Sequence, residues 1–130
     1  MTERELIKRT KQFALRIIKL VGALPRTIEG RSIAGQLMRS GTSVAANYRA
    51  ACRARSKVEF VAKLGIVEEE ADESAFWLEL IIDASLMKES KVRPLLAEAG
   101  EIVAITASSK KTASRFPQKS KIANRNSKIS

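Results

Sequence analysis

Histidine is absent from this chain of 130 residues, and its absence excludes a large part of enzyme chemistry. Without an imidazole there is no His-based acid–base catalysis and no Ser-His or Cys-His nucleophile pair. Most transition-metal sites lose their commonest ligand as well. We therefore expect neither an enzymatic activity nor a cofactor.

Cysteine, aromatic residues and long apolar runs are also scarce. The single cysteine, Cys52, cannot form an internal disulfide, which fits a reducing cytoplasm. Aromatic residues make up 5% of the chain, so few side chains could stack on nucleic-acid bases. The longest uncharged segment, residues 40–48, is much shorter than the roughly 20 apolar residues of a membrane span. Basic residues precede any apolar stretch, so we expect no signal peptide, no membrane partner and a cytoplasmic location.

Charge, by contrast, is abundant and unevenly distributed. The formal net charge is +10, from 24 Lys and Arg against 14 Asp and Glu. Residues 1–57 alone carry +10, residues 58–91 carry −6, and residues 115–130 carry +5. The basic segments favour an anionic partner such as RNA or DNA, and the acidic middle favours contacts with a basic surface.

Apolar residues recur every three to four positions, which is typical of amphipathic helices. The pattern predicts helices at residues 3–23, 31–53, 56–88 and 92–113. A Ser-x-x-Glu capping box begins the third helix at Ser56, and Pro94 fits the first turn of the fourth. Short connections make residues 1–114 an all-α, antiparallel up-down-up-down four-helix bundle. Residues 115–130 are predicted to be a disordered basic tail that is dispensable for folding.

Basic side chains on the second predicted helix and in the tail are the candidates for binding nucleic acid. They are Arg31, Arg39, Arg49, Arg53, Lys119 and Lys121. Arginine binds phosphate oxygens with two parallel hydrogen bonds, which suits contact with a nucleic-acid backbone. The alternatives are a solvated arginine face, arginines paired with the acidic edge of the third helix, and a tail that only increases solubility.

A second apolar strip on the third predicted helix lies away from the seam that would face the core. With two carboxylates it forms a candidate oligomer interface, composed of Ile66, Glu69, Glu73, Trp77 and Leu80. Trp77 is the expected anchor because tryptophan is enriched at interfaces, and base stacking is its alternative role. Several carboxylates on this helix are spaced four residues apart, but di-metal bundles need Glu-x-x-His pairs, so we expect no metal site.

Small and polar residues of the second predicted helix point to close packing. Gly35 and Gly41 each cost a helix about 1 kcal/mol relative to alanine, so we expect close contact with a neighbouring helix to compensate. Asn47 is expected to hydrogen-bond to a neighbouring helix, and a hydrogen bond to a ligand is the alternative. Cys52 lies on the apolar arc and is expected to be a buried, unreactive side chain.

Three motifs resemble those of a known family. They are Gln36-Leu37-x-Arg39-Ser40, Ser43-Val44-Ala45-Ala46-Asn47 and Ser56-x-x-Glu59-Phe60. Over roughly residues 5–113 the chain resembles the bacterial four-helix-bundle family, also called the 23S rRNA intervening-sequence protein family. The resemblance implies an antiparallel protomer, a homopentameric ring and no established enzymatic activity. The fold is also similar to the accessory proteins of diversity-generating retroelements, basic pentamers that engage nucleic acid and a reverse transcriptase.

Two hypotheses of different class follow. The first is an oligomeric accessory protein that holds RNA or DNA through its basic surface, with a protein partner such as a reverse transcriptase. The alternative is a protein-interaction scaffold with no direct nucleic-acid role, in which the charges act between subunits and towards a partner.

Overall fold

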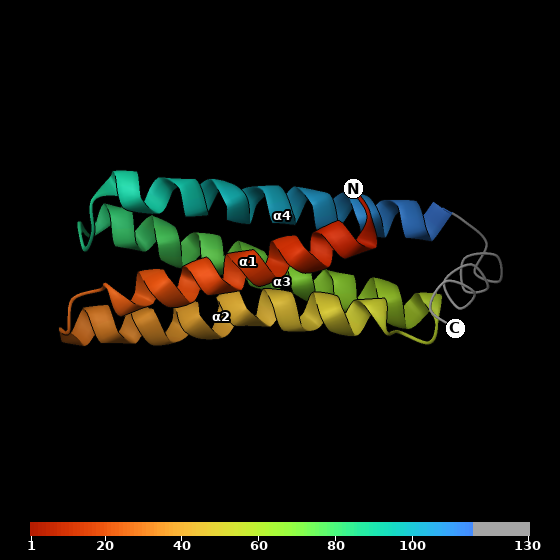
Figure 1. Ribbon diagram of the computed structural model, residues 1–130, viewed down its shortest axis with the longest axis horizontal. Coiled ribbons are helices and arrows are strands. Elements are labelled where there is room, and N and C mark those ends of the chain that lie inside the picture. Colours follow the sequence, from red (N-terminus) through yellow and green to blue (C-terminus); the bar gives the residue numbers. More distant parts are fainter. Residues whose placement is uncertain (116–130) are drawn as a thin grey trace.

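The computed structural model describes residues 1–115, and this part of the chain is helical with no strand (Figure 1). The helices are α1 (Glu3–Gly22), α2 (Ile28–Cys52), α3 (Lys57–Asp83) and α4 (Glu89–Arg115). They run alternately up and down, which confirms the predicted all-α four-helix bundle. The predicted tail lies outside the described residues from residue 116 onward, and with it the candidates Lys119 and Lys121.

α2 begins three residues earlier than predicted because Thr27 caps it. The Thr27 hydroxyl accepts a hydrogen bond of 3.1 Å from the backbone N–H of Gly30. Glycine at residue 30 also lets the turn close, since a Cβ there would lie 2.1 Å from the carbonyl oxygen of Pro25. The connection between α1 and α2 is therefore shorter than its composition suggested.

α3 ends at Asp83, five residues earlier than predicted. The chain leaves the helix through Ser85, which has a φ of 56° in the left-handed region. The N–H of Leu86 donates to the carbonyl of Ile81 at 3.0 Å, and the N–H of Ser85 donates to the carbonyl of Ile82 at 3.0 Å. This is a Schellman motif, which normally has glycine at the left-handed residue. A serine there carries no helix-stop signal, which explains the wrong prediction.

α4 begins at Glu89, three residues before the predicted start. Pro94 consequently lies in the second turn instead of the first, and the prediction of its place was wrong. Proline has no N–H, so the carbonyl of Ser90 receives no helical hydrogen bond from residue 94. Pro94 is on the exposed side of the helix, where water can reach that carbonyl.

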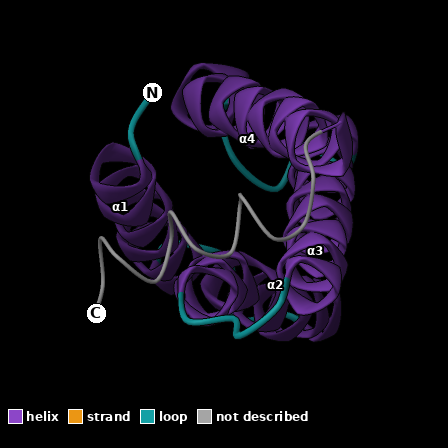
Figure 2. Cartoon of the chain, turned by 90° about the vertical axis from the view of Figure 1, so that its right-hand side faces the viewer, coloured by secondary structure: helices purple, strands orange, loops and turns teal. Residues whose placement is uncertain are grey.

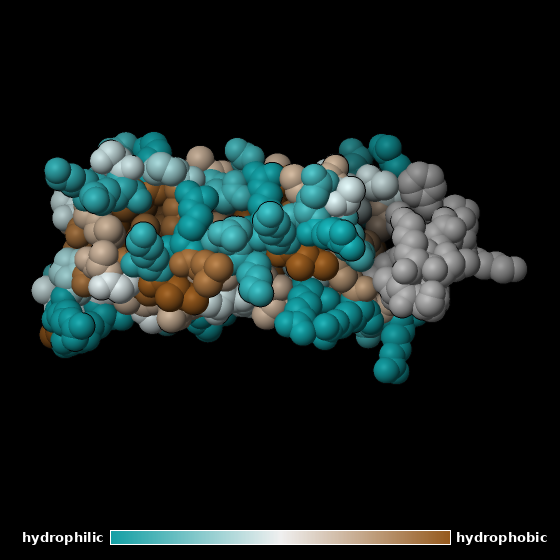
Figure 3. Space-filling view, in the orientation of Figure 1, coloured by the Kyte–Doolittle hydropathy of each residue, from teal (hydrophilic) through white to brown (hydrophobic). Residues whose placement is uncertain are grey.

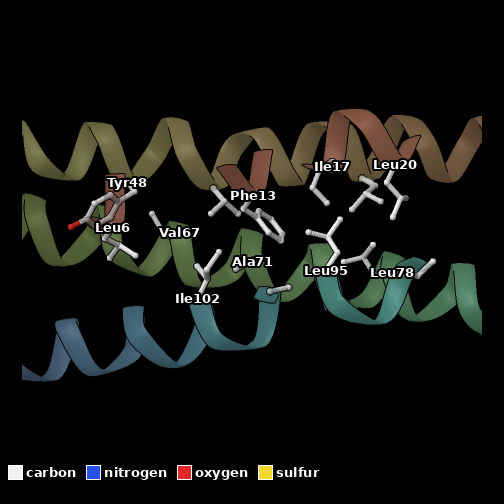
Figure 4. Packing of buried hydrophobic residues seen from close by; sticks show 14 of the residues in the cluster. Leu6, Phe13, Ile17, Leu20, Tyr48, Val67, Ala71, Leu78, Leu95 and Ile102 are labelled. Atoms are coloured by element: carbon white, nitrogen blue, oxygen red, sulfur yellow. The ribbon is translucent and has the colours of Figure 1, made fainter. Parts of the chain in front are cut away.

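The core runs along the bundle axis and takes side chains from all four helices (Figure 4). Fully buried side chains include Phe13, Ile17, Leu37, Val44, Leu64, Leu78 and Ile102. They recur at the spacing that the apolar pattern predicted, so the inward faces of the helices are confirmed. Within the described residues no helix is long and apolar enough to cross a membrane.

Helices that follow one another in the chain pack closely, whereas α1 and α4 lie farther apart (Figure 2). Arg9 of α1 bridges this seam to α4. Its Nε lies 2.6 Å from Glu98 Oε2, its Nη2 lies 2.8 Å from Glu98 Oε1, and Nη2 also pairs with Glu101. Hydrogen bonds to Glu98 first and Glu101 second raise the pKa of Arg9. These ion pairs link α1 to α4 through side chains, where the two helices otherwise make little contact.

Candidate nucleic-acid interface

The four arginines predicted on α2 have different surroundings. Arg39 faces α3, where its Nη1 lies 3.1 Å from Glu70 Oε1 and its Nη2 lies 2.5 Å from Glu73 Oε2. Hydrogen bonding to Glu73 raises the pKa of Arg39. Arg39 therefore pairs with carboxylates of α3, but not with those of the predicted acidic edge, which contains Glu68 and Asp72. Its charge is largely neutralised within the protomer.

Glu73 also accepts a hydrogen bond from the only tryptophan. The indole Nε1 of Trp77 lies 3.1 Å from Glu73 Oε2, the oxygen that Arg39 contacts. The hydrogen bond from Arg39 first, and that from Trp77 second, hold the pKa of Glu73 below its usual range. Arg39, Glu70, Glu73 and Trp77 thus form one cluster between α2 and α3, which we call the Arg39 cluster.

Arg49 and Arg53 lie on the side of α2 that faces α1, whereas Arg39 lies on the side that faces α3. With Lys11 they line a groove of about 400 Å³ between α1 and α2. The remaining lining is Ile7, Ala45, Ala46 and Cys52, which give it a mainly apolar floor. Within residues 1–115 none of the three cations forms an ion pair with a carboxylate. This α1/α2 groove therefore presents three positive charges to solvent.

Two other polar residues of α2 bond locally. The Nη1 of Arg31 donates to the backbone carbonyl of Arg26 at 3.0 Å, which ties it to the connection before α2. The amide nitrogen of Asn47 donates to the carbonyl of Ser43 at 2.9 Å and to its hydroxyl at 2.7 Å. Both bonds lie within α2, so the predicted link from Asn47 to a neighbouring helix was wrong. Cys52, in contrast, is buried as predicted.

The candidate oligomer interface on α3 is partly engaged inside the protomer. Trp77 is half-buried and packs against the core, Glu73 belongs to the Arg39 cluster, and Ile66 and Leu80 are half-buried. Of the predicted interface residues, only Glu69 is exposed.

Two other apolar side chains of α3 are more exposed than these, and the sequence did not lead us to predict them. Phe76 is 49% exposed and meets the Trp77 ring edge-on at 5.1 Å between centroids, and Val58 is 71% exposed. Val58, Ala62, Glu69, Phe76 and Leu80 follow one another at four- and seven-residue spacing, so they share one stripe of α3. This spacing is visible in the sequence and could have predicted the exposed stripe. We call this stripe the α3 outer strip.

The face formed by α1 and α2 carries its own exposed apolar side chains. They are Ile7, Leu15 and Ile18 of α1 and Met38 of α2, between 37% and 50% exposed. Figure 3 shows apolar surface among hydrophilic side chains on this face. The sequence pattern had placed Ile18 on the core half of the first helix, and its 42% exposure corrects that assignment.

Acidic residues gather between α3 and α4. A recess of about 450 Å³ is lined by Glu68, Glu69 and Asp72, and Lys110 of α4 pairs with Glu68 at 2.8 Å. In the part of the chain that the structure describes, no group of three potential ligands lies in a geometry that could hold a metal ion. The recess makes this side of the bundle negative, opposite in sign to the α1/α2 groove.

These features define a small all-α bundle protein with a basic α1/α2 face and an acidic α3 side. The chain belongs to the 23S rRNA-intervening sequence protein family, whose model matches residues 2–108. It is similar to a crystal structure from Bacteroides thetaiotaomicron, described as a protein of unknown function from the S23 ribosomal protein family. That similarity has a TM-score of 0.79 at 32% identity and covers 85% of this chain and 99% of the other. A search of curated proteins finds no match.

Proposed function

We propose that this protein is a non-enzymatic, self-assembling bundle that binds RNA or DNA through its basic surface as a cytoplasmic accessory factor. The observation that carries the proposal is the α1/α2 groove, where Lys11, Arg49 and Arg53 converge without a carboxylate from the described residues. The family name refers to 23S rRNA, which is consistent with an RNA ligand. The single cysteine fits a reducing cytoplasm.

Binding at this groove would depend on phosphate charge and not on base identity. Lysine and arginine that neutralise phosphates release condensed counterions, a contribution that is independent of sequence. None of the residues that line the groove is aromatic, so it has no platform on which a base could stack. Sequence preference, where it exists, would come from nucleic-acid shape or from a partner protein.

Charge reversal in the groove tests the proposal. The test variant is Lys11→Glu/Arg49→Glu/Arg53→Glu, and the matched control is Arg55→Glu/Lys63→Glu/Lys111→Glu, which changes the net charge equally outside the groove. Affinity for a labelled mixed-sequence 20-nucleotide RNA and for a 20-base-pair DNA is measured by fluorescence anisotropy at several salt concentrations. Each phosphate contact steepens the logarithmic salt dependence by roughly 0.7 for single-stranded RNA and roughly 0.9 for duplex DNA. The test variant, which removes three contacts, should therefore have a slope that is smaller by about 2 with the RNA and about 3 with the DNA.

A third chain that lacks residues 116–130 separates the groove from the tail. Loss of binding in the groove variant, with the control close to the parent, supports the proposal. Equal binding by groove variant and control, with binding abolished by tail removal, would assign the interaction to the tail alone. A parent that binds neither RNA nor DNA at low salt would leave the protein-interaction scaffold as the function.

That second function, contact with protein, is favoured by the α3 outer strip. Phe76 and Val58 are exposed apolar side chains on the same stripe of α3 as Glu69, and a neighbouring copy could present the basic, partly apolar α1/α2 face to them. Two different faces in contact form a head-to-tail interface, which closes into a ring when the rotation allows. The family resemblance supplies the number five. A reverse transcriptase remains the kind of protein partner that the similarity to retroelement accessory proteins implies.

A further inference from the structure

A second basic groove lies between α1 and α4, near the opposite end of α1. It has a volume of about 290 Å³, and its cations are Arg16 and Lys19 from α1 and Lys91 from α4. Its floor is apolar and includes the buried side chains of Leu20 and Leu95. The sequence pattern assigned no role to any of these cations. The groove lies where α1 and α4 make less contact than the helices that follow one another in the chain.

The carboxylates nearest in the chain are already engaged. α4 contains Glu89, Glu98 and Glu101; Glu89 pairs with Arg93, and the other two pair with Arg9. α1 has no acidic residue after its first turn. None of the ion pairs within residues 1–115 involves Arg16, Lys19 or Lys91, so the charge of this α1/α4 groove is available to an external anion.

The outer face of α1 connects the two grooves. Lys11 borders the α1/α2 groove and Lys19 borders the α1/α4 groove, eight residues apart, which is about 12 Å along a helix. Exposed Lys8 extends the basic face towards the helix start. One strand of a nucleic-acid duplex carries a phosphate about every 3.4 Å along its axis, so 12 Å corresponds to roughly four nucleotides.

We propose that the α1/α4 groove is a second phosphate-binding site, and that a nucleic-acid backbone crosses α1 from one groove to the other. This inference rests on the proposed function, and it makes α1, not the arginine stripe of α2, the main contact element. Arg39 has no part in the track because Glu70 and Glu73 neutralise it on the far side of α2. The ligand is recognised by its evenly spaced phosphates.

The test compares Arg16→Glu/Lys19→Glu/Lys91→Glu with the same Arg55→Glu/Lys63→Glu/Lys111→Glu control. Binding of the labelled 20-nucleotide RNA and of the 20-base-pair DNA is followed by anisotropy across a salt series, and light scattering records the assembly state of each protein. The groove variant should bind at least about tenfold more weakly at low salt and lose about 2 from the salt slope with the RNA and about 3 with the DNA, while the control stays within about threefold of the parent. A neutral variant, Arg16→Gln/Lys19→Gln/Lys91→Gln, should also bind RNA more weakly than the parent, but with a smaller loss of affinity than the charge-reversed variant.

The outcomes separate this inference from the proposed function. If the α1/α4 variants bind like the control while the α1/α2 groove variant loses binding, the second site is refuted and the first stands. If the α1/α4 variants instead change the assembly state with RNA affinity intact, the groove is a contact between copies and the inference is overturned. If the parent itself binds neither RNA nor DNA, the proposed function has failed and the second site is refuted with it.

Discussion

Gly41 lies where α2 approaches α1 closely, and a larger residue there has no room. A Cβ at residue 41 would lie 2.7 Å from Cγ1 and 2.8 Å from Cγ2 of the fully buried Ile17. We expect Gly41→Ala to lower the free energy of unfolding by about 1–2 kcal/mol, because overpacking outweighs the better helix propensity of alanine. Urea unfolding followed by circular dichroism measures the change.

Gly35 provides the matched control on the same helix. Gly35 is exposed, and a Cβ there would meet no atom of a neighbouring helix within 4 Å, so the close packing predicted for this glycine was wrong. Gly35→Ala therefore gains helix propensity without a clash. The gain should be about 0.5–1 kcal/mol. Opposite signs for the two variants are expected, and a stabilised Gly41→Ala would contradict the close approach of α1 and α2.

Glu73 makes stability depend on acidic pH. Its folded-state pKa is lowered by Arg39 and Trp77, so the stabilisation is present above the unfolded-state pKa of about 4.3 and is lost as the pH falls through the folded value. Parent stability should therefore fall more steeply below about pH 4.3 than that of Glu73→Gln. Urea midpoints measured from about pH 6 to about pH 3 give the comparison.

The indole of Trp77 offers a direct readout of the same cluster. It is the only tryptophan in the chain, and its N–H donates to Glu73, so its fluorescence should respond when that carboxylate is protonated. A fluorescence titration with its midpoint below about 4.3 is expected for the parent and not for Glu73→Gln. If the fluorescence of the parent and of Glu73→Gln changed with pH in the same way, the hydrogen bond between Trp77 and Glu73 would be contradicted.

At the scale of an element, the end of α3 depends on a residue with unfavourable backbone geometry. Ser85 has a φ of 56°, and the left-handed region costs a residue with a Cβ about 1–2 kcal/mol. Ser85→Gly should raise the free energy of unfolding by about 1 kcal/mol, since glycine adopts this conformation without strain. The shift of the urea midpoint measures it.

Ser85→Ala separates the backbone effect from loss of the hydroxyl. Alanine keeps the Cβ, so its stability should stay near that of the parent. A gain in the alanine variant equal to that in the glycine variant would show that the hydroxyl, and not the left-handed geometry, sets the cost.

At the scale of the whole molecule, the α3 outer strip should control assembly. Phe76 is its largest exposed apolar side chain, and aspartate there would add a charge to a surface that already contains Glu69. We expect Phe76→Asp to convert a multi-subunit particle, about five times the 14.3 kDa chain for a pentamer, into the monomer. Light scattering at tens of micromolar measures the mass.

A control variant and a comparison variant complete the assembly experiment. Ala104→Asp adds the same charge at an exposed position of α4 outside the strip and should leave assembly unchanged. Trp77→Ala should weaken assembly less than Phe76→Asp, because Trp77 is half-buried within its own protomer. A parent that is already monomeric would exclude self-assembly and, with it, the ring.

The sequence alone determined the number of helices, their order and their inward faces. Those properties depend on the spacing of apolar residues such as Phe13, Ile17 and Leu64 along the chain. Burial of the apolar face of each helix is the main driving force of folding, so the spacing decides which face points inward. Termini were less predictable, because the end of α3 at Ser85 depends on backbone geometry that serine does not signal.

Only the tertiary structure decided which charges remain available. Arg39, Arg49 and Arg53 belong to one stripe in the sequence, but packing turns Arg39 towards Glu73 of α3 and leaves the other two beside Lys11 of α1. The α1/α4 groove could not be predicted from the sequence either, since Lys91 lies more than 70 residues along the chain from Arg16 and Lys19. A helical period gives the direction of a side chain around its own axis, whereas the neighbour it meets depends on how the helices pack.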